Sequence, residues 1–252
     1  MRSASKTGLR KSGRVTPERA HTEIEVKLRI ADKRLLVDRL AHLKARLIRV
    51  RVHEMNTLYD TPDGKLARHG QMLRLRVERP APDTNREGLT QKVSAGKSEI
   101  SALLTLKGPA KGQKASDPGR YKVREEHEAR VSDHREMARI LEALGVRPWF
   151  RYEKFRSTFE LPSVRNLKLA LDETPIGLFL ELEGPPGEIN RAAALLGFAR
   201  SGYISKSYGA LFMERSGLAG RVSGQASPNE PVPFSGVRDM LFGRSKRISA
   251  AV

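Results

Sequence analysis

The sequence lacks cysteine and has few aromatic residues, which make up 6% of its 252 positions and include a single tryptophan. The absence of cysteine excludes a disulfide scaffold, a thiolate metal site and a cysteine nucleophile. Long apolar runs are also missing, because the longest, such as residues 192–196, fall far short of the roughly 20 residues of a membrane span. The first residues contain no apolar stretch typical of a secretory signal. We therefore expect a cytoplasmic protein that makes no contact with a membrane.

Acidic residues are in the minority, with 29 Asp and Glu against 47 Lys and Arg, and the formal net charge is +18. Residues 1–20 contain six Lys or Arg and one Glu, and residues 218–252 contain five Lys or Arg and two acidic residues. Both segments are rich in Ser, Gly, Pro and Ala, so we expect disordered basic tails there. Residues 21–217 between them are still strongly basic, and we expect them to form one domain that binds an anion.

Alternation of apolar and charged residues runs through most of this domain and predicts β-strands. In residues 22–30, Glu23, Glu25 and Lys27 fall on one face of the strand, and the residues between them, which are apolar, fall on the other. Further strands are predicted at residues 46–53, 55–61, 72–79, 103–107, 121–130, 150–161, 166–172 and 178–184. Residues 80–101 are polar and irregular, and we expect them to form an insertion loop.

Few helices are expected, and they lie between or after the strands. Residues 33–48 carry one leucine stripe, and Asp32 precedes them as an N-cap. The stripe consists of Leu36, Leu40, Leu43 and Leu47. Other helices are predicted after Asp133, which resembles an N-cap, and at residues 188–198 and 205–215. The pattern favours a β-rich α+β fold in which an antiparallel sheet is covered by a few helices.

The polar faces of the predicted strands are almost entirely charged. Each charged pair alone is compatible with a sheet face that is exposed to water. However, two neighbouring side chains of like charge about 4 Å apart repel each other by about 4 kcal/mol at an effective dielectric constant of 20. A divalent cation removes this repulsion between carboxylates, and a polyanion removes it between Arg and Lys. If the sheet closes with its charged face inside, the enclosed space therefore suits a metal-bound polyphosphate.

Short motifs on these strands carry a resemblance to a known family. The first motif is Glu23-Ile24-Glu25-Val26-Lys27. The others follow in order: Tyr59-Asp60-Thr61, Leu73-Arg74-Leu75-Arg76, Thr105-Leu106-Lys107-Gly108-Pro109, Arg124-Glu125-Glu126-His127-Glu128, Lys154-Phe155-Arg156 and Glu181-Leu182-Glu183. Together they resemble the ExExK, RxR, TxKGP and RxExE strands of the CYTH superfamily, the triphosphate tunnel metalloenzymes. The resemblance covers about residues 21–215 and leaves out the tails and the insertion at 80–101.

This resemblance implies a closed eight-stranded antiparallel β-barrel whose interior is a hydrophilic tunnel. The carboxylates implied to face Mg²⁺ or Mn²⁺ are Glu23, Glu25, Glu126, Glu128, Glu181 and Glu183. The cations implied to bind phosphates are Lys27, Arg74, Arg76, Lys107, Arg124, Lys154 and Arg156, with Lys206 at one mouth of the tunnel. The implied catalytic residues are Glu23, Glu25, Lys27, Lys107 and Arg124. Asp172 is expected to orient a neighbouring cation.

The leading function that the resemblance implies is hydrolysis of a triphosphate: inorganic tripolyphosphate, or a nucleoside or thiamine triphosphate. A class IV adenylate cyclase, which converts ATP into cyclic AMP and pyrophosphate, uses the same charged tunnel and stays open as an alternative. A third function, of another class, is non-catalytic binding of polyphosphate or RNA through the basic tails. The tails and the net charge favour it, but it leaves the six glutamates without a role, whereas a metal-dependent function explains them.

Overall fold

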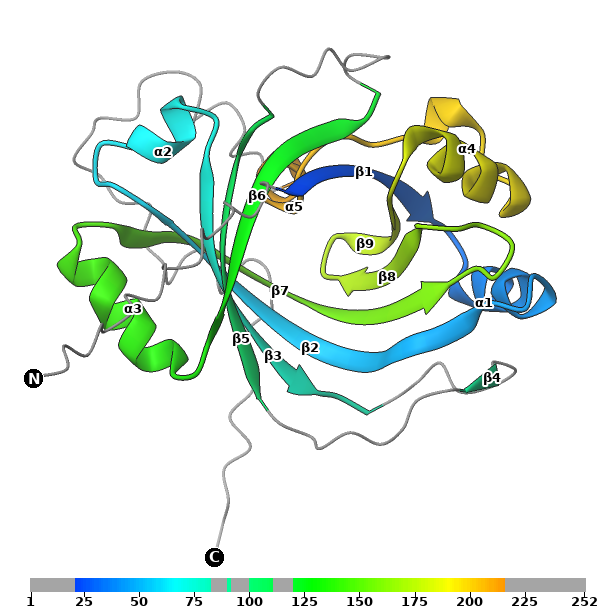
Figure 1. The fold of residues 1–252 in the computed structure, drawn as a ribbon, viewed down its shortest axis with the longest axis horizontal. Helices are drawn as coiled ribbons and strands as arrows, with labels where there is room; N and C mark the ends of the chain where they lie inside the picture. Colours follow the sequence, from blue (N-terminus) through cyan, green and yellow to red (C-terminus); the bar gives the residue numbers. More distant parts are fainter. Residues whose placement is uncertain (1–20, 83–89, 92–99, 111–119, 216–252) are drawn as a thin grey trace, which may run out of the picture.

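The computed structural model describes residues 21–82, 90–91, 100–110 and 120–215, and its main feature is a closed barrel of eight antiparallel strands (Figure 1). The strands are β1 (His21–Ile30), β2 (Arg46–Asp60), β3 (Met72–Pro80), β5 (Ser101–Pro109), β6 (Lys122–Val131), β7 (Arg147–Glu160), β8 (Lys168–Thr174) and β9 (Gly177–Glu183). Their order is β3-β5-β6-β1-β9-β8-β7-β2, and β2 pairs back with β3 to close the barrel. The expected fold is confirmed.

Five helices lie around the barrel in the described part of the chain. They are α1 (Lys33–His42), α2 (Lys65–Arg68), α3 (His134–Ala143), α4 (Pro186–Leu195) and α5 (Tyr208–Arg215), with a short 3₁₀ turn, η1 (Arg200–Gly202), before α5. The predicted N-caps are confirmed: the Asp32 carboxylate accepts from the N–H groups at the start of α1, and Asp133 does the same for α3. None of these helices is long and apolar enough to cross a membrane.

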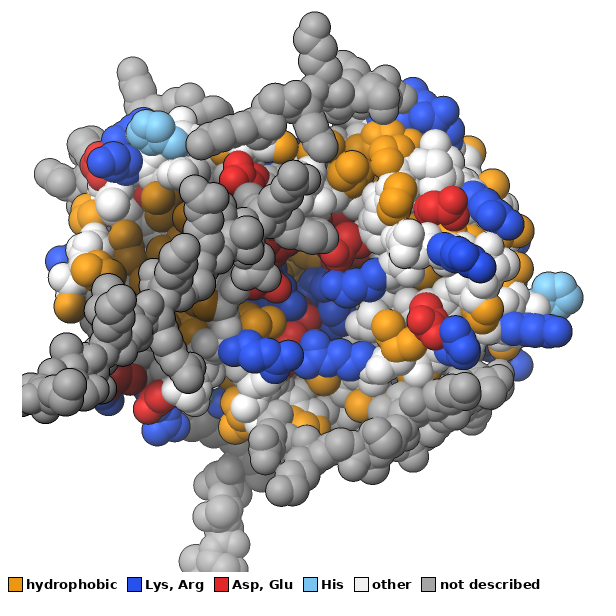
Figure 2. Space-filling view, viewed as in Figure 1, with side chains coloured by type: hydrophobic (Ala, Val, Ile, Leu, Met, Phe, Trp, Pro, Cys, Tyr) orange, Lys and Arg blue, Asp and Glu red, His pale blue; other side chains and the backbone are white. Residues whose placement is uncertain are grey.

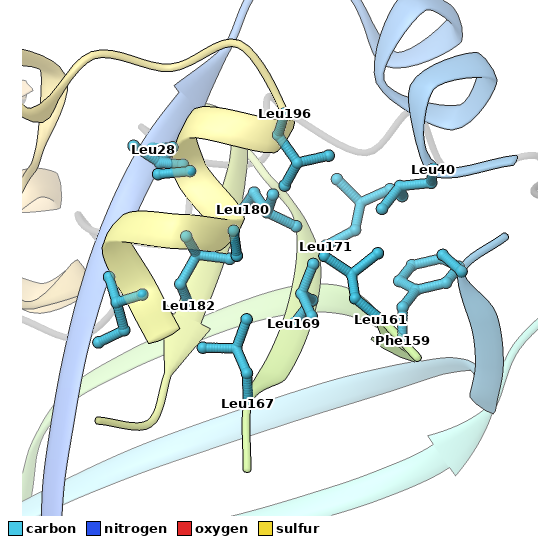
Figure 3. Close-up of a cluster of buried hydrophobic side chains, with 14 of the residues drawn as sticks. Leu28, Leu40, Phe159, Leu161, Leu167, Leu169, Leu171, Leu180, Leu182 and Leu196 are labelled. Carbon is cyan, nitrogen blue, oxygen red and sulfur yellow. The ribbon is translucent and has the colours of Figure 1, made fainter. Parts of the chain in front are cut away.

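The main hydrophobic core lies outside the barrel. The outward faces of β1, β8 and β9 pack there against α1 and α4, and Phe159 and Leu161 belong to the same cluster (Figure 3). Leu28, Leu40, Leu171 and Leu180 are among the side chains that are at most 1% exposed. Each buried leucine stabilises the fold by about 1.5–3 kcal/mol relative to its exposed state. Because the apolar side chains of the strands pack in this outer core, the side chains on the inner face of the barrel can be charged.

The predicted helix at residues 33–48 is too long. Helix α1 ends at His42, and Lys44 follows in a left-handed conformation with φ of 56°. The chain then continues as β2, in which Leu47 is 1% exposed and packs into the same core as Leu36 and Leu40. A leucine stripe spaced for a helix therefore spans two elements that share one core.

Strand β2 replaces the two strands predicted at 46–53 and 55–61. It runs without a break from Arg46 to Asp60. Its pairing register with β7 shifts along the strand, and these shifts do not interrupt it. The predicted insertion at 80–101 begins where β3 ends and contains β4 (Thr90–Gln91), a short strand parallel to the start of β2. The predicted tails, residues 1–20 and 218–252, lie outside the described residues.

Candidate active site

Charged side chains from seven strands line a cavity of about 120 Å³ inside the barrel. They are Glu23, Glu25, Lys27, Arg74, Arg76, Lys107, Lys122, Glu126, Glu128, Lys154, Arg156, Lys168, Glu181 and Glu183. Figure 2 shows acidic and basic side chains gathered in a hollow at the middle of one face of the molecule. The polar lining of this cavity distinguishes it from an ordinary barrel core, which apolar side chains would fill.

The two-residue period of β1 explains how charge reaches the interior. Glu23, Glu25 and Lys27 point inward and are 5%, 5% and 1% exposed, while Val26 and Leu28 point outward into the core. Beside Lys27 the backbone of β1 exchanges two hydrogen bonds with Ile204, each with an N···O distance of 2.9 Å. This bridge brings the segment before α5 to the barrel, so that Tyr208 lines the cavity.

On the acidic side of the cavity, carboxylates alternate with ammonium groups. The Nζ atom of Lys27 lies 2.8 Å from Glu25 and 3.2 Å from Glu181, and Lys122 Nζ lies 2.6 Å from Glu25. Lys107 donates to Glu23. Burial alone would raise the pKa of Glu25, but the charges of Lys27 and Lys122 outweigh it and hold that pKa well below its usual range.

Glu126 is the exception on this side. Burial raises its pKa, and repulsion by Glu23 and Glu128 adds to that rise, while Lys107, 3.2 Å away, opposes it. Burial is the main cause of the rise and the two carboxylates add to it, and nearby positive charge opposes both effects. The surroundings of Glu126 would therefore gain stability from an added cation.

On the basic side, one carboxylate fixes two cations. Asp172 is fully buried and accepts from Lys154 Nζ at 2.9 Å, from Arg156 Nε at 2.6 Å and from Arg156 Nη2 at 2.5 Å. The Tyr208 hydroxyl donates to it at 2.6 Å. Asp172 does not line the cavity but lies behind these groups, which agrees with its expected role in orienting a neighbour.

Two arginines of β3 complete the basic side. Arg74 donates to the hydroxyl of Thr105 at 3.2 Å, and that hydroxyl donates to Glu128 at 2.8 Å. Arg76 donates to Glu78 at 3.3 Å. Since each contact uses only some of the guanidinium N–H groups, both arginines keep donors that can bind phosphate oxygens.

The comparisons with known proteins agree with this geometry. The family model of the CYTH domain matches residues 21–198. The chain belongs to the CYTH domain family. A protein of Methanocaldococcus jannaschii named "putative adenylate cyclase" is 28% identical to it over 175 residues, which are 69% of this chain and 83% of that protein.

Two solved structures share the CYTH fold. A "putative adenylate cyclase" from Vibrio parahaemolyticus superposes with a TM-score of 0.58 at 18% identity, over 76% of this chain and 98% of that chain. The PH1819 protein from Pyrococcus horikoshii OT3 gives a TM-score of 0.55 at 22% identity, over 77% and 99% of the two chains. At these identities the likeness concerns the fold.

The CYTH barrel brings together nearly all the residues that the motifs singled out, and two of them lie elsewhere. Arg124 donates to the backbone oxygen of Gly70 at 2.5 Å instead of lining the described cavity. Lys206 precedes α5, is 56% exposed at its side chain and pairs with Glu214 at 2.5 Å. The other twelve all line the cavity.

Four site residues were missed by the motifs. Lys122 and Lys168 line the cavity, and Lys122 could have been found because it shares its face of β6 with Arg124 and Glu126. Glu54 and Asn56 are fully buried beneath the basic side chains. Glu54 was hidden by the prediction of two strands where β2 is continuous, because the boundary fell at residue 54, whereas Asn56 lay inside the second predicted strand but belonged to none of the motifs.

The acidic residues of the CYTH barrel fit a divalent cation by their chemistry. Carboxylate oxygens are the ligands that Mg²⁺ prefers, and Glu23 and Glu128 both lie close enough to Glu126 to repel it. Within the described residues, no three acidic or histidine side chains converge as a ready metal site. Lysines 27, 107 and 122 lie between the carboxylates, so a metal ion would have to replace some of these ammonium contacts.

Proposed function

We propose that this CYTH protein is a metal-dependent triphosphatase. The observation that carries the proposal is the lining of a single cavity by six carboxylates and eight cations. A ligand complementary to both must be a polyanion that brings metal ions with it. Divalent-metal dependence is general among CYTH tunnel enzymes, and a triphosphate with Mg²⁺ or Mn²⁺ has this composition.

Substrate binding would use the basic side of the cavity. Arg74, Arg76 and Arg156 present planar N–H donors there and Lys154 adds a point charge, and Lys27 adds another from the acidic side. Asp172 has already fixed the positions of Lys154 and Arg156, so little ordering entropy is lost when a phosphate chain enters. Such preorganised charge is the main means of catalysis in phosphoryl transfer.

Hydrolysis would add a water oxygen to the terminal phosphorus and break the bond to the bridging oxygen. The water loses one proton, and the products are orthophosphate and the shortened polyphosphate. The arginines and lysines stabilise the charge that grows on the leaving oxygen. Glu23, Glu25 and the pair Glu181 and Glu183 would hold Mg²⁺ or Mn²⁺, which supplies Lewis-acid charge for the phosphate oxygens.

The test is a measurement of products from a panel of triphosphates. Tripolyphosphate, ATP and thiamine triphosphate are each incubated with the full chain and Mg²⁺ or Mn²⁺, and orthophosphate, pyrophosphate and cyclic AMP are measured. We expect orthophosphate from at least one substrate. A chain that releases no phosphate from any triphosphate with either metal is not a triphosphatase.

Cyclisation of ATP is the second candidate, favoured by the name of the Methanocaldococcus jannaschii relative. In that reaction the ribose 3′-hydroxyl attacks the α-phosphate and pyrophosphate leaves, so cyclic AMP and pyrophosphate appear in equal amounts. The same cavity would bind the substrate, and the products alone separate the two reactions. A non-catalytic binder, the third candidate, would give neither product and would lose affinity when its tails are removed.

A further inference from the structure

We propose that Glu54 is a positioning residue that sets the charge of the phosphate-binding side of the cavity and so limits how tightly polyphosphate is held. The inference rests on the proposed function, because it concerns the same cavity. Glu54 belongs to β2 and is fully buried. It does not itself line the cavity but lies behind the cations that do.

Three cations surround Glu54 at ion-pair distance. Lys154 Nζ lies 3.5 Å from Oε2, Arg76 Nη1 lies 3.6 Å from Oε1, and Arg156 Nε lies 3.7 Å from Oε1. Burial alone would raise the pKa of Glu54, but these charges outweigh it and hold the pKa well below its usual range. The carboxylate is therefore ionised in the folded protein.

The contacts of Glu54 differ in kind from those of Asp172. Asp172 accepts four hydrogen bonds, three of them from Lys154 and Arg156. Neither oxygen of Glu54 accepts a hydrogen bond from any described residue, although both are shielded from solvent. Asp172 therefore fixes the geometry of Lys154 and Arg156, whereas Glu54 compensates charge and leaves their N–H donors available for the ligand.

Arg76 shows the same division of roles. It donates a hydrogen bond to Glu78 on its own strand, which fixes the guanidinium, and it faces Glu54 without such a bond. Hydrogen bonds that the three cations donate to Asp172 and Glu78 thus hold them in place. Loss of the Glu54 charge would keep this geometry and make the binding side more positive, so a polyanion would bind more tightly and its products would leave more slowly.

The substitution that tests this is Glu54→Gln, which keeps the shape and removes the charge. We expect tripolyphosphate to bind the variant at least about tenfold more tightly than the wild type in titration calorimetry with EDTA present. With metal, KM and kcat should both fall. Glu54→Asp retains the charge and should bind tripolyphosphate as the wild type does.

Glu173→Gln is the matched control. Glu173 adjoins Asp172 on β8 but pairs with Lys33 and Arg51 outside the cavity, so its loss should leave tripolyphosphate affinity unchanged. If Glu54→Gln is too unstable for calorimetry, the rise in melting temperature that tripolyphosphate causes is measured instead, and it should be larger for the variant than for the wild type.

The outcomes separate this inference from the proposed function. Equal or weaker binding of tripolyphosphate by folded Glu54→Gln would overturn the role of Glu54 while the wild type still hydrolyses triphosphates. A rise in melting temperature with tripolyphosphate that is equal or smaller for Glu54→Gln than for the wild type would overturn it as well. A wild-type chain that neither binds nor hydrolyses tripolyphosphate or any other triphosphate contradicts the proposed function itself.

Discussion

Lys27 and Glu25 point into the barrel from the same face of β1, with 2.8 Å between Lys27 Nζ and Glu25 Oε1. Glu181 approaches the same ammonium from β9 at 3.2 Å. Burial alone would lower the pKa of Lys27, but the two carboxylates raise it above its ordinary value. Glu25 and Lys27 are therefore both ionised at neutral pH.

Glu25→Gln tests whether this face is the active site. The change keeps the volume but removes a charged oxygen from the acidic side, so we expect turnover of a triphosphate substrate to fall at least about 100-fold, or about 2.7 kcal/mol of transition-state stabilisation. More metal should restore part of the loss. Initial rates across a metal titration measure both effects.

Ile24→Gln is the control at the neighbouring position. Ile24 packs against the outer core, so its replacement should lower the melting temperature and change turnover per folded molecule only modestly. Full turnover in Glu25→Gln would mean that the charged face is not the active site.

Removal of metal ions should abolish triphosphate turnover. The carboxylate pairs at 23/25 and 181/183 supply oxygen ligands of the kind that Mg²⁺ and Mn²⁺ prefer. We expect activity to vanish in excess EDTA and to return when either metal is added beyond the chelator. Undiminished rates in EDTA would contradict the metal-dependent mechanism.

Asp172→Asn should destabilise the fold. The asparagine leaves Lys154 and Arg156 without their shared carboxylate in a buried place, a loss that costs about 3–5 kcal/mol in comparable ion pairs. Urea unfolding measures the change in free energy. Glu214→Gln, which breaks the exposed pair with Lys206, is the control and should change stability by less than about 1 kcal/mol.

The resemblance implied phosphate binding for both Lys107 and Lys206, and the structure places the two lysines in different surroundings. Lys107 is 6% exposed and lies between Glu23 and Glu126, whereas Lys206 is exposed. We expect Lys107→Gln to lose triphosphate turnover by about 100-fold or more and Lys206→Gln to stay within about threefold of the wild type. A large loss in Lys206→Gln would show that this lysine moves to the substrate.

Stability should fall in acid. The pKa values of Glu25 and Glu181 are held below the ordinary value of 4.5, chiefly because Lys27 and Arg156 outweigh the effect of burial. Carboxyl groups with lowered pKa bind protons more weakly in the folded chain than in the unfolded one. Their stabilisation is complete above pH 4.5 and is lost as the pH falls further.

Thermal unfolding measured between pH 3 and pH 7 checks this dependence. The melting temperature should drop below about pH 4.5, and Glu25→Gln should show a shallower drop because one of the responsible carboxyls is gone. Identical acid dependence in the variant and the wild type would mean that Glu25 is not ion-paired in the folded protein.

The sequence predicted the strands because their signal is local, whereas their closure into a barrel was implied by the family resemblance. Residues at i and i+2 share a face, so the charged inner faces of β1, β3, β7 and β9 could be read from the motifs. Contacts between distant segments could not be read. The support of Lys154 and Arg156 by Asp172 depends on pairing between β7 and β8, and the pair of Lys206 with Glu214 depends on where α5 begins.

Glu54 shows why part of the site stayed hidden. The two-residue period breaks near the middle of β2, and the strand shifts register against β7 before it reaches Val52. A prediction that follows the period therefore starts a new strand and leaves out the residue at the boundary. The helix predicted from the long leucine stripe was too long for a related reason, because leucines of a helix and of the strand that follows it pack into one apolar core.

Closure of the barrel also affects how copies of the chain meet. Each of the eight barrel strands has a hydrogen-bonded neighbour on both sides, and β2 pairs with β3, β7 and β4. An open sheet would present a row of unpaired backbone groups to other chains and could add strands from them. In the paired stretches of these strands those groups are used within the molecule, so the stretches offer no free edge to a strand of another copy.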